Sequence, residues 1–498
     1  TDADHNVAIG YLSLTADTLG SRSVAIGRGT LASQNFTTAT DTYNTAVGYA
    51  AGNDITTGTQ NTFIGGLAGD ANTTANNNTA VGYNSLGANT TGTQNVAIGT
   101  FALDANTTAN NNVAIGHGSL GENTTGTQNT AVGALALNDN TTANNNVAIG
   151  ANALEENTTG GSNTAVGTNA LEANTTGAQN TAVGAFALDA NTADLNTAVG
   201  FNSQILTTTG QLNTSVGASS LDANTTGGSN TSIGYNSLTA NTTGNSNVAL
   251  GRDALAANTT ASNNTAIGKD ALKANTTGNS LLAVGHSALM TCTTVSNLTA
   301  IGFEAGKANT TGTSLTALGY KALTANTTGG NNTALGRDAL LVNTEGGNNT
   351  AVGADTLEAN TTATHNTAVG SGALKSNTTG NFNVAVGALT LDANTTAASN
   401  TGVGYAVLTS NTTGAGNTAV GRDALAANTT GTHNVAIGHD ALDANTTANN
   451  NNALGYQALT ENTTGSANTA FGFSALIAND VPIALFIAVI PSEFIVKS

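Results

Sequence analysis

The residues of this sequence that could do chemistry are few and widely spaced. One cysteine, Cys292, rules out an intrachain disulfide framework and a cysteine-based zinc site. No nucleophile with an adjacent base and no separate phosphate-binding loop is found, so we predict no enzyme active site, no metal site and no cofactor. The six histidines are scattered and are expected to lie on the surface: His5, His117, His286, His365, His433 and His439.

Acidic residues beside basic ones form the next candidate group. The motif Gly-Arg-Asp-Ala-Leu begins at Gly251, Gly336 and Gly421, and related Gly-Lys-Asp and Gly-His-Asp motifs begin at Gly268 and Gly438. A basic residue next to Asp at a corner of the chain is most simply a surface ion pair, which stabilises by less than about 1 kcal/mol. A calcium site would need clustered oxygen ligands, which these motifs do not supply.

Several tyrosines follow a glycine at one point of a recurring phrase. A ring there could stack on the sugar rings of a glycan, or it could pack against the neighbouring corner of the chain. Twenty Asn-Thr-Thr triplets also match the N-glycosylation signal, which counts only in a secretory eukaryotic host. The candidates for glycan contact are Tyr83, Tyr235, Tyr320, Tyr405 and Tyr456.

The charge balance limits the partners. The chain carries 29 acidic and 11 basic residues, a net charge of −18. No basic surface is available to neutralise phosphates, so we expect neither nucleic acid nor an anionic membrane surface as a partner. The longest apolar stretch, residues 483–490, is far shorter than the roughly 20 residues of a membrane-spanning helix, so no membrane insertion is expected.

These residues belong to one repeat. We take the residue before the pattern [Thr/Val]-Ala-[Val/Ile/Leu]-Gly as position 1, which gives 28 starts from Asn6 to Asn468. The interval is 17 residues except for 21 before Asn44 and 16 before Asn196. A spacing kept this strictly indicates a repeat architecture. Position 5 is glycine, and it is predicted to have a positive φ angle or a close backbone neighbour.

A 17-residue unit with a central glycine and an Asn-Thr-Thr turn cannot supply two helices. We predict a strand at positions 2–4, a second extended segment around Leu at position 9 and Ala at position 11, and a turn at positions 12–15. Each repeat then forms one coil of an all-β parallel β-solenoid, and about 28 coils spaced by about 4.8 Å give a rod roughly 130 Å long. Stacked coils also predict an amide ladder at position 12, formed by Asn89, Asn106, Asn123, Asn140, Asn157 and Asn174.

Side-chain directions set the expected contacts between chains. Positions 2 and 4 share one face of the strand, and Ala at position 3 points the other way. We place the large apolar side chains of positions 4 and 9 in the core, and the small Ala, with the Thr or Val beside it, against a neighbouring rod. Two large side chains per coil stabilise by about 1.5–3 kcal/mol each. Ordering each residue costs about 1–2 kcal/mol, so a second buried face, and hence a homo-oligomer, is predicted.

These motifs resemble the head repeat of YadA-like trimeric autotransporter adhesins. The similarity covers residues 6–478 and recurs in register. It implies a left-handed parallel β-roll, with three chains side by side and the inner strand of each facing the trimer axis. The longer form with Ala-Asn-Thr-Thr-Gly is more similar to the repeats of phage tail fibres. The motifs are Ser-Val-Ala-Ile-Gly at Ser23 and Asn-Val-Ala-Ile-Gly at Asn6, Asn95, Asn112, Asn146 and Asn434.

The repeat breaks near residue 478, so we divide the chain into a repeat rod (1–478) and an apolar tail (479–498). The tail could cover the last coil as a cap, or it could join the first coil of another copy head to tail. The residues that could form this joint are Val481, Ile483, Leu485, Phe486, Ile487, Val489, Ile490, Phe494, Ile495 and Val496.

The sequence as a whole predicts a structural subunit of an extracellular, cell-surface or virion fibre. The subunit is expected to form a homo-oligomer, trimeric by the resemblance, which could also polymerise head to tail. The alternative is an adhesin or phage tail fibre that binds host-surface glycans or receptors.

Overall fold

The computed structural model describes residues 3–477 and 486–487 of the chain. The chain divides into two compact units, unit 1 (Thr1–Asn247) and unit 2 (Val248–Ser498). All regular elements of the described residues are β-strands, and 28 of these strands are three residues long. No helix capable of crossing a membrane occurs in this part of the chain.

The strands of unit 1 recur once per repeat. Two additional two-residue strands, β2 and β4, lie in the first and second intervals of the repeat and pair with each other. The strands are β1 (Val7–Ile9), β2 (Gly20–Ser21), β3 (Val24–Ile26), β4 (Thr40–Asp41), β5 (Thr45–Val47), β6 (Thr62–Ile64), β7 (Thr79–Val81), β8 (Val96–Ile98), β9 (Val113–Ile115), β10 (Thr130–Val132), β11 (Val147–Ile149), β12 (Thr164–Val166), β13 (Thr181–Val183), β14 (Thr197–Val199), β15 (Thr214–Val216) and β16 (Thr231–Ile233).

The strands of unit 2 follow the same rule. They are β17 (Val248–Leu250), β18 (Thr265–Ile267), β19 (Leu282–Val284), β20 (Thr299–Ile301), β21 (Thr316–Leu318), β22 (Thr333–Leu335), β23 (Thr350–Val352), β24 (Thr367–Val369), β25 (Val384–Val386), β26 (Thr401–Val403), β27 (Thr418–Val420), β28 (Val435–Ile437), β29 (Asn452–Leu454), β30 (Thr469–Phe471) and β31 (Phe486–Ile487).

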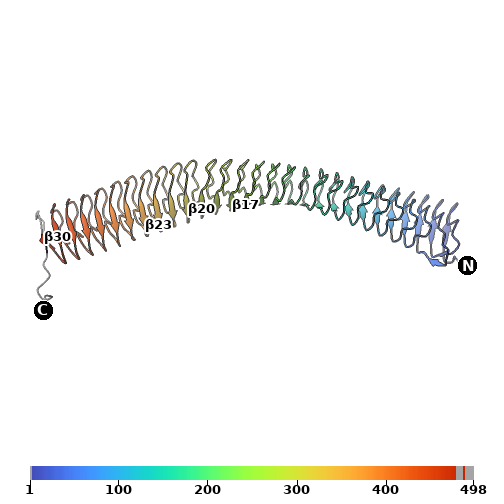
Figure 1. Cartoon of the computed structure of the whole chain (residues 1–498), viewed down its shortest axis with the longest axis horizontal. Coiled ribbons are helices and arrows are strands. Elements are labelled where there is room, and N and C mark those ends of the chain that lie inside the picture. Colours follow the sequence, from blue (N-terminus) through green and yellow to red (C-terminus); the bar gives the residue numbers. More distant parts are fainter. Residues whose placement is uncertain (1–2, 478–485, 488–498) are drawn as a thin grey trace, which may run out of the picture. The chain divides into compact units, whose positions relative to one another are not determined.

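Neighbouring three-residue strands pair in parallel, one repeat apart. In unit 1, Ala80 of β7 pairs with Ala97 of β8, and Ala97 pairs with Ala114 of β9. Figure 1 shows the strands of each unit stacked as successive arrows, with one coil of chain between each pair. The predicted all-β parallel β-solenoid with 17-residue coils is therefore confirmed.

The predicted second extended segment is not found in the regular coils that the structure describes. The chain instead turns tightly after position 5, because positions 7 and 9 have left-handed φ angles, as at Phe101 (57°) and Leu103 (54°). Position 17, just before the next strand, also has a left-handed φ angle. The backbone hydrogen bonds continue between coils, with Phe101 N–H donating to Tyr83 O at 3.0 Å and Leu103 N–H donating to Ser119 O at 3.0 Å. A left-handed leucine is unfavourable in isolation, and neighbouring coils hold it there.

The predicted alternation of side chains along the strand is confirmed, but the predicted inner face is wrong for positions 3 and 4. Ala97 at position 3 is fully buried, together with Ala102 and Leu103, whereas Ile98 at position 4 is 38% exposed. The interior of the coil is narrow, so it holds a small residue opposite Leu at position 9. The larger branched residues of positions 2 and 4 face outward instead.

Phe63 shows that volume decides this arrangement. Phe63 occupies position 3 and is fully buried, and the same coil has Gly69 where most coils have Leu. A Cβ atom added to Gly69 would lie 2.6 Å from Cε1 of Phe63, and one added to Gly52 of the preceding coil would lie 2.9 Å from Cδ2. A large residue therefore enters position 3 only where its neighbours lack side chains.

Two residues of the apolar tail are described. Phe486 and Ile487 form β31, which pairs in parallel with Ala470 and Phe471 of β30. The other proposed joint residues lie outside the described part of the chain: Val481, Ile483, Leu485, Val489, Ile490, Phe494, Ile495 and Val496.

Candidate functional site

The asparagine at position 1 ties three segments of chain together. Asn95 is fully buried, and its Oδ1 accepts the backbone N–H of Asn112 in the next coil at 3.0 Å. Its Nδ2 donates to the carbonyl oxygen of Ala109, at position 15 of its own coil, at 2.9 Å. We call these two bonds the asparagine clamp. The clamp recurs at Asn78, Asn112, Asn129, Asn146 and Asn163.

The sequence did not reveal this role. Position 1 was used only to mark the start of each repeat, and an asparagine before a short strand is typical of an ordinary turn. The available signal was that the residue recurs once per coil beside a strand whose neighbours all need their N–H groups paired.

The predicted amide ladder at position 12 is confirmed. Asn106 Nδ2 donates to Asn89 Oδ1 of the preceding coil at 2.8 Å and to Ala109 O of its own coil at 3.2 Å. The amide-to-amide bond continues through Asn123, Asn140, Asn157 and Asn174.

The same asparagines begin the Asn-Thr-Thr triplets. Asn89 and Asn106 are fully buried, and the amide nitrogen that a glycan would need is already a hydrogen-bond donor. These triplets are therefore structural in the folded coil, and a glycan there would disrupt the ladder.

The ladders are interrupted at one place in unit 2. Leu281, Leu298 and Leu315 replace the position-1 asparagine in three successive coils and are buried. Cys292 replaces the asparagine of position 12, and its Sγ lies 3.8 Å from the carbonyl oxygen of Val295. Burial raises the pKa of the Cys292 thiol to about 11, so it stays protonated at neutral pH and is a poor nucleophile.

Glycine at position 5 allows the coils to approach closely, as predicted. Gly99 has a φ angle of 138°, and a Cβ atom there would lie 2.3 Å from the carbonyl oxygen of Gly116 in the next coil. Any side chain at this position would push the coils apart.

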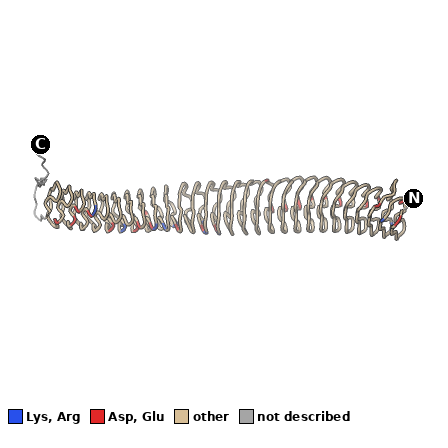
Figure 2. Tube along the Cα trace, turned by 90° about the horizontal axis from the view of Figure 1, so that it is seen from below, with Lys and Arg blue, Asp and Glu red and all other residues tan. Residues whose placement is uncertain are grey.

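The outward side chains of positions 2 and 4 form an uncharged stripe of Thr, Val, Ile and Leu along the strands of each unit, which we call the outward stripe. Position 2 is Thr or Val in the three-residue strands except for Leu282 and Asn452, and position 4 is Ile, Val or Leu except for Phe471. None of these strands carries a charged residue, and charges are sparse along the whole trace (Figure 2). A surface of this kind is typical of a contact site.

The five candidate tyrosines lie on the surface but are not brought together. Tyr83, Tyr235, Tyr320, Tyr405 and Tyr456 sit at position 6 of five separate coils and are 43–56% exposed. Three of them pack on rings of adjacent coils: Tyr320 is stacked with Phe303 at 5.4 Å, Tyr456 is stacked with His439 at 5.5 Å, and Tyr83 lies edge-on to Phe101 at 5.6 Å between ring centroids. Packing against the neighbouring coil is thus found for these three, and histidine as a stacking partner was not foreseen.

The predicted local ion pairs are confirmed. Arg337 Nη1 lies 3.0 Å from Asp338 Oδ2, and Arg422 Nε lies 2.9 Å from Asp423 Oδ2. Sequence reasoning missed the pairs between coils, such as Arg337 Nη2 with Asp355 Oδ1 at 2.7 Å.

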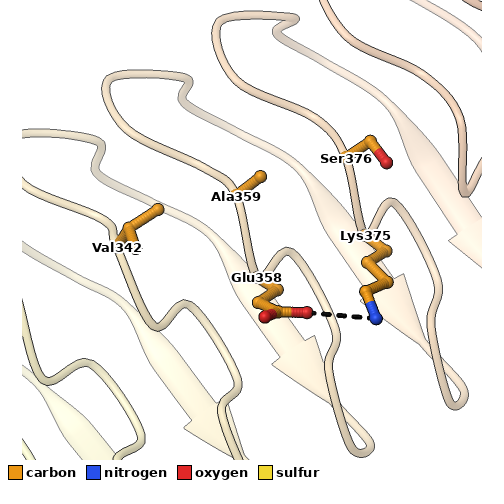
Figure 3. Close-up of a pocket in the computed structure, with 5 residues that line it drawn as sticks. All are labelled: Val342, Glu358, Ala359, Lys375 and Ser376. Atoms are coloured by element: carbon orange, nitrogen blue, oxygen red, sulfur yellow. Dashed lines mark ion pairs between the residues drawn. The ribbon is translucent and has the colours of Figure 1, made fainter.

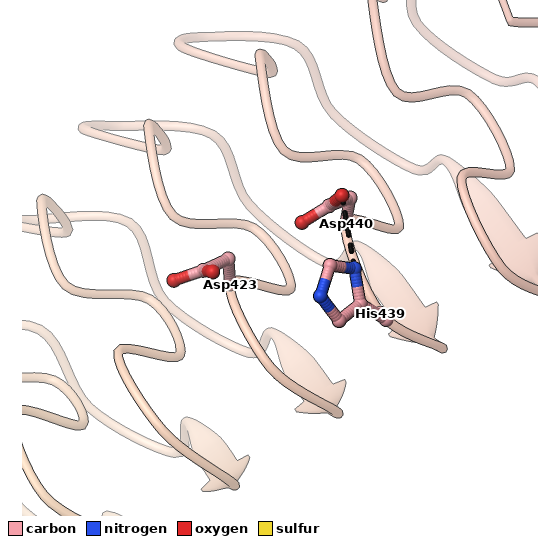
Figure 4. Close-up of side chains that lie close together, drawn as sticks. All are labelled: Asp423, His439 and Asp440. Carbon is pink, nitrogen blue, oxygen red and sulfur yellow. Dashed lines mark ion pairs between the residues drawn. The ribbon is translucent and has the colours of Figure 1, made fainter.

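One group of potential metal ligands occurs among the described residues. Asp423, His439 and Asp440 place ligand atoms within 4.8 Å of one another, at positions 6 and 7 of adjacent coils (Figure 4). His439 Nδ1 lies 2.9 Å from Asp440 Oδ2, and Arg422 pairs with Asp423. Asp423 is thus paired with a cation, and Asp440 lies beside the imidazole of His439. The signal for this group was the recurrence of Asp at position 7 in consecutive coils.

A shallow groove of about 330 Å³ runs between coils of unit 2. It is lined by Val342, Glu358, Ala359, Lys375 and Ser376, and its charged groups are Glu358 and Lys375, paired at 3.3 Å (Figure 3). The groove contains none of the predicted site residues.

Stacked carboxylates occur at position 10 of unit 1, in Glu155, Glu172 and Asp189. Burial, followed by the charge of Glu172 and a hydrogen bond with it, raises the pKa of Asp189 to about 6. Burial and the charge of Glu172 also raise the pKa of Glu155. Burial and stacking therefore act together on these carboxylates.

Comparisons with protein-family models and with curated proteins find no match for this chain. Its function must therefore be inferred from the coil geometry and the outward stripe.

Replacing Asn112 by Ala should destabilise the coils on both sides of it. Asn129 N–H would lose its acceptor, and Gly126 O would keep only the bond from Asn123. A buried unpaired group costs about 1–3 kcal/mol, so amide hydrogen exchange of Asn129 should accelerate accordingly. Thr125→Ala, an exposed change in the same coil, is the control; equal exchange in the two variants would contradict the clamp.

Replacing Asp189 by Asn should stabilise unit 1 at neutral pH and not in acid. The folded pKa of about 6 lies above the unfolded value, so the aspartate destabilises the fold increasingly as pH rises from about 4 to 6. After discounting for solvent screening, the gain at pH 7.5 should be at most about 1 kcal/mol, vanishing near pH 4. Urea unfolding at both pH values measures it, with exposed Glu345→Gln as the control; a gain independent of pH would contradict it.

Proposed function

We propose that this chain is a structural subunit of a fibre or filament outside the cell or on a virion, without catalytic activity. The carrying observation is that coil after coil makes the same backbone, clamp and ladder bonds to the next one. Such a stack supplies length and stiffness in increments of one coil, because each coil contacts only its neighbours.

We further propose that copies of the chain associate side by side through the outward stripe. The stripe repeats at strand spacing, about 4.8 Å, and a second copy of this chain is the partner that matches this period along its whole length. A stable interface buries about 800 Å² per partner, which the 14 three-residue strands of one unit would reach with roughly 60 Å² each. Side chains of the stripe such as Ile98 and Leu250 are 38% and 41% exposed, so they have surface area that such an interface could bury.

The details of the assembly remain predictions from the resemblance. A trimer and a left-handed β-roll are proposed on that ground. Head-to-tail joining through the apolar tail is a further proposal, and the parallel pairing of β31 with β30 favours a capping role for Phe486 and Ile487.

Binding to host-surface glycans is the second candidate function. It is favoured by the exposed position-6 tyrosines, which include Tyr83 and Tyr235 at 52% and 56% exposure. A glycan array screened with the intact protein, and with these tyrosines changed to Ser, would test it.

Removal of whole coils should shorten the protein without unfolding it. Deleting residues 95–179 removes five repeats and joins Gln94 to Asn180, which can take over the clamp contacts of Asn95. The particle should shorten by about 24 Å at about 4.8 Å per coil, as measured by small-angle X-ray scattering. Deleting residues 95–102, half a coil, should instead break the stack; equal tolerance of both deletions would contradict the coil as the unit of length.

Charges on the outward stripe should separate the copies. The triple variant with Ile98→Lys, Ile115→Lys and Ile149→Lys would bury three cations at the proposed interface, which is costly. Sedimentation of this variant should therefore give the mass of a single chain. Thr108→Lys, Thr125→Lys, Thr159→Lys adds the same charges to exposed sites of the same coils and should leave the assembly intact. A monomeric wild-type protein, or an unchanged mass of the stripe variant, would contradict association through the stripe.

A further inference from the structure

A stripe of equivalent strands has a weakness as an interface. Sliding one copy along another by a single coil removes the contact of only one strand and leaves all the others nearly unchanged. Copies of this chain therefore need a residue that distinguishes one axial position from the next. Such a residue must break the repeat on the outward face.

Leu282 and Phe471 also depart from the repeat at outward positions, but both are apolar, and Asn452 is the departure that introduces an amide. It is the single amide side chain at an outward position of the described three-residue strands, in β29, and it lies beside Leu454. Asn452 and Leu454 point outward, and Ala453 between them is buried. The side-chain amide of Asn452 makes no hydrogen bond within the described chain, whereas its backbone N–H donates to Asn468 O at 2.8 Å.

The surface around Asn452 is apolar and hollowed. A depression of about 240 Å³ is lined by Asn452 with Val435, Ile437, Leu454, Thr469 and Phe471. If this face is covered, the amide loses water, and its immediate neighbours offer it one hydroxyl group at most. A covered amide without a partner is unfavourable, whereas two amides that face each other satisfy both.

We propose that Asn452 fixes the axial register and the parallel orientation of the copies, an inference that rests on the proposed side-by-side association. In parallel copies without an offset, Asn452 meets Asn452 of the other copy, and the amides pair. With an offset of one coil, one Asn452 faces Val435 and the other faces Thr469. In antiparallel copies the amide faces a different strand. A single polar residue in an apolar interface specifies register in coiled coils in the same way.

The test traps the register chemically in the full-length chain. Thr316→Cys and Thr333→Cys lie in the adjacent strands β21 and β22, both outward and exposed, and each is made with a different affinity tag. Cys292→Asn removes the native thiol and restores the residue typical of position 12. The two proteins are mixed, reassembled and cross-linked with the shortest reagent that links a self pair. A link between two copies of the same variant, a self link, reports the aligned register. A link between one copy of each variant, a mixed link, reports an offset of one coil.

The proposal predicts mainly self links in the native background. Asn452→Thr, which makes β29 like its neighbours, should raise the ratio of mixed to self links about tenfold, as expected for losing one buried amide pair. Moving the amide, with Asn452→Thr and Thr418→Asn together, should restore the low ratio. Thr401→Val, at the same position of β26, is the matched control and should not change it.

The outcomes separate this inference from the proposed association. An unchanged ratio in Asn452→Thr, with links still forming, would overturn the role of Asn452 and leave association intact. Chains that assemble but form no links would show that the cysteines of neighbouring copies lie far apart, as in antiparallel copies, and would overturn it as well. Chains of monomeric mass without links in any background would overturn the association itself.

Discussion

A typical coil closes on one carbonyl oxygen, at position 15, that accepts two asparagine amides. In the coil that starts at Asn95, Ala109 O accepts from Asn95 at 2.9 Å and from Asn106 at 3.2 Å. Both amides are fully buried, so neither can exchange its partner for water, and leaving one unpaired would be costly. Closure at this point fixes the circumference, and the left-handed residues of positions 7, 9 and 17 are the path that a chain of this length must take.

The circumference in turn sets the volume inside the coil. Position 3 and position 9 share this volume, and in two places an exception at one position is matched by an exception at the other. Phe63 at position 3 accompanies Gly69 at position 9. Ser215 at position 3 accompanies Gln204 at position 9 of the preceding coil, whose Nε2 donates to Ser215 Oγ at 2.9 Å. In these coils the residue at position 3 is therefore matched in size or polarity to the residue at position 9. The larger residues of the strand lie outside.

The sequence alone was sufficient for the coil length, the parallel stacking, the glycine of position 5 and the ladder of position 12, because all of these depend on period and on residue type. It was not sufficient for the direction of the strand. A period of two separates the faces of a strand but does not say which face is inside, and hydrophobicity favoured the wrong one because Ile98 is larger than Ala97. The pair of Phe63 and Gly69 was the available signal. The left-handed leucines left no signal, since their conformation is imposed by neighbouring coils.

Because the coils are so alike, the residues that depart from the repeat carry the specific information. These departures are of two kinds. Inside the coil they are compensated within the chain: Phe63 by Gly69, Ser215 by Gln204, and Leu281 by the apolar column that it forms with Leu298 and Leu315. Outside, Asn452 has no such compensation among the described residues, although its strand is otherwise like the rest. The departures inside the coil have matching residues within the chain, whereas the side-chain amide of Asn452 does not. The chain is therefore suited to a partner that supplies a hydrogen-bonding group to this amide. Of the partners with the same strand spacing, another copy of the chain presents an amide at the same height.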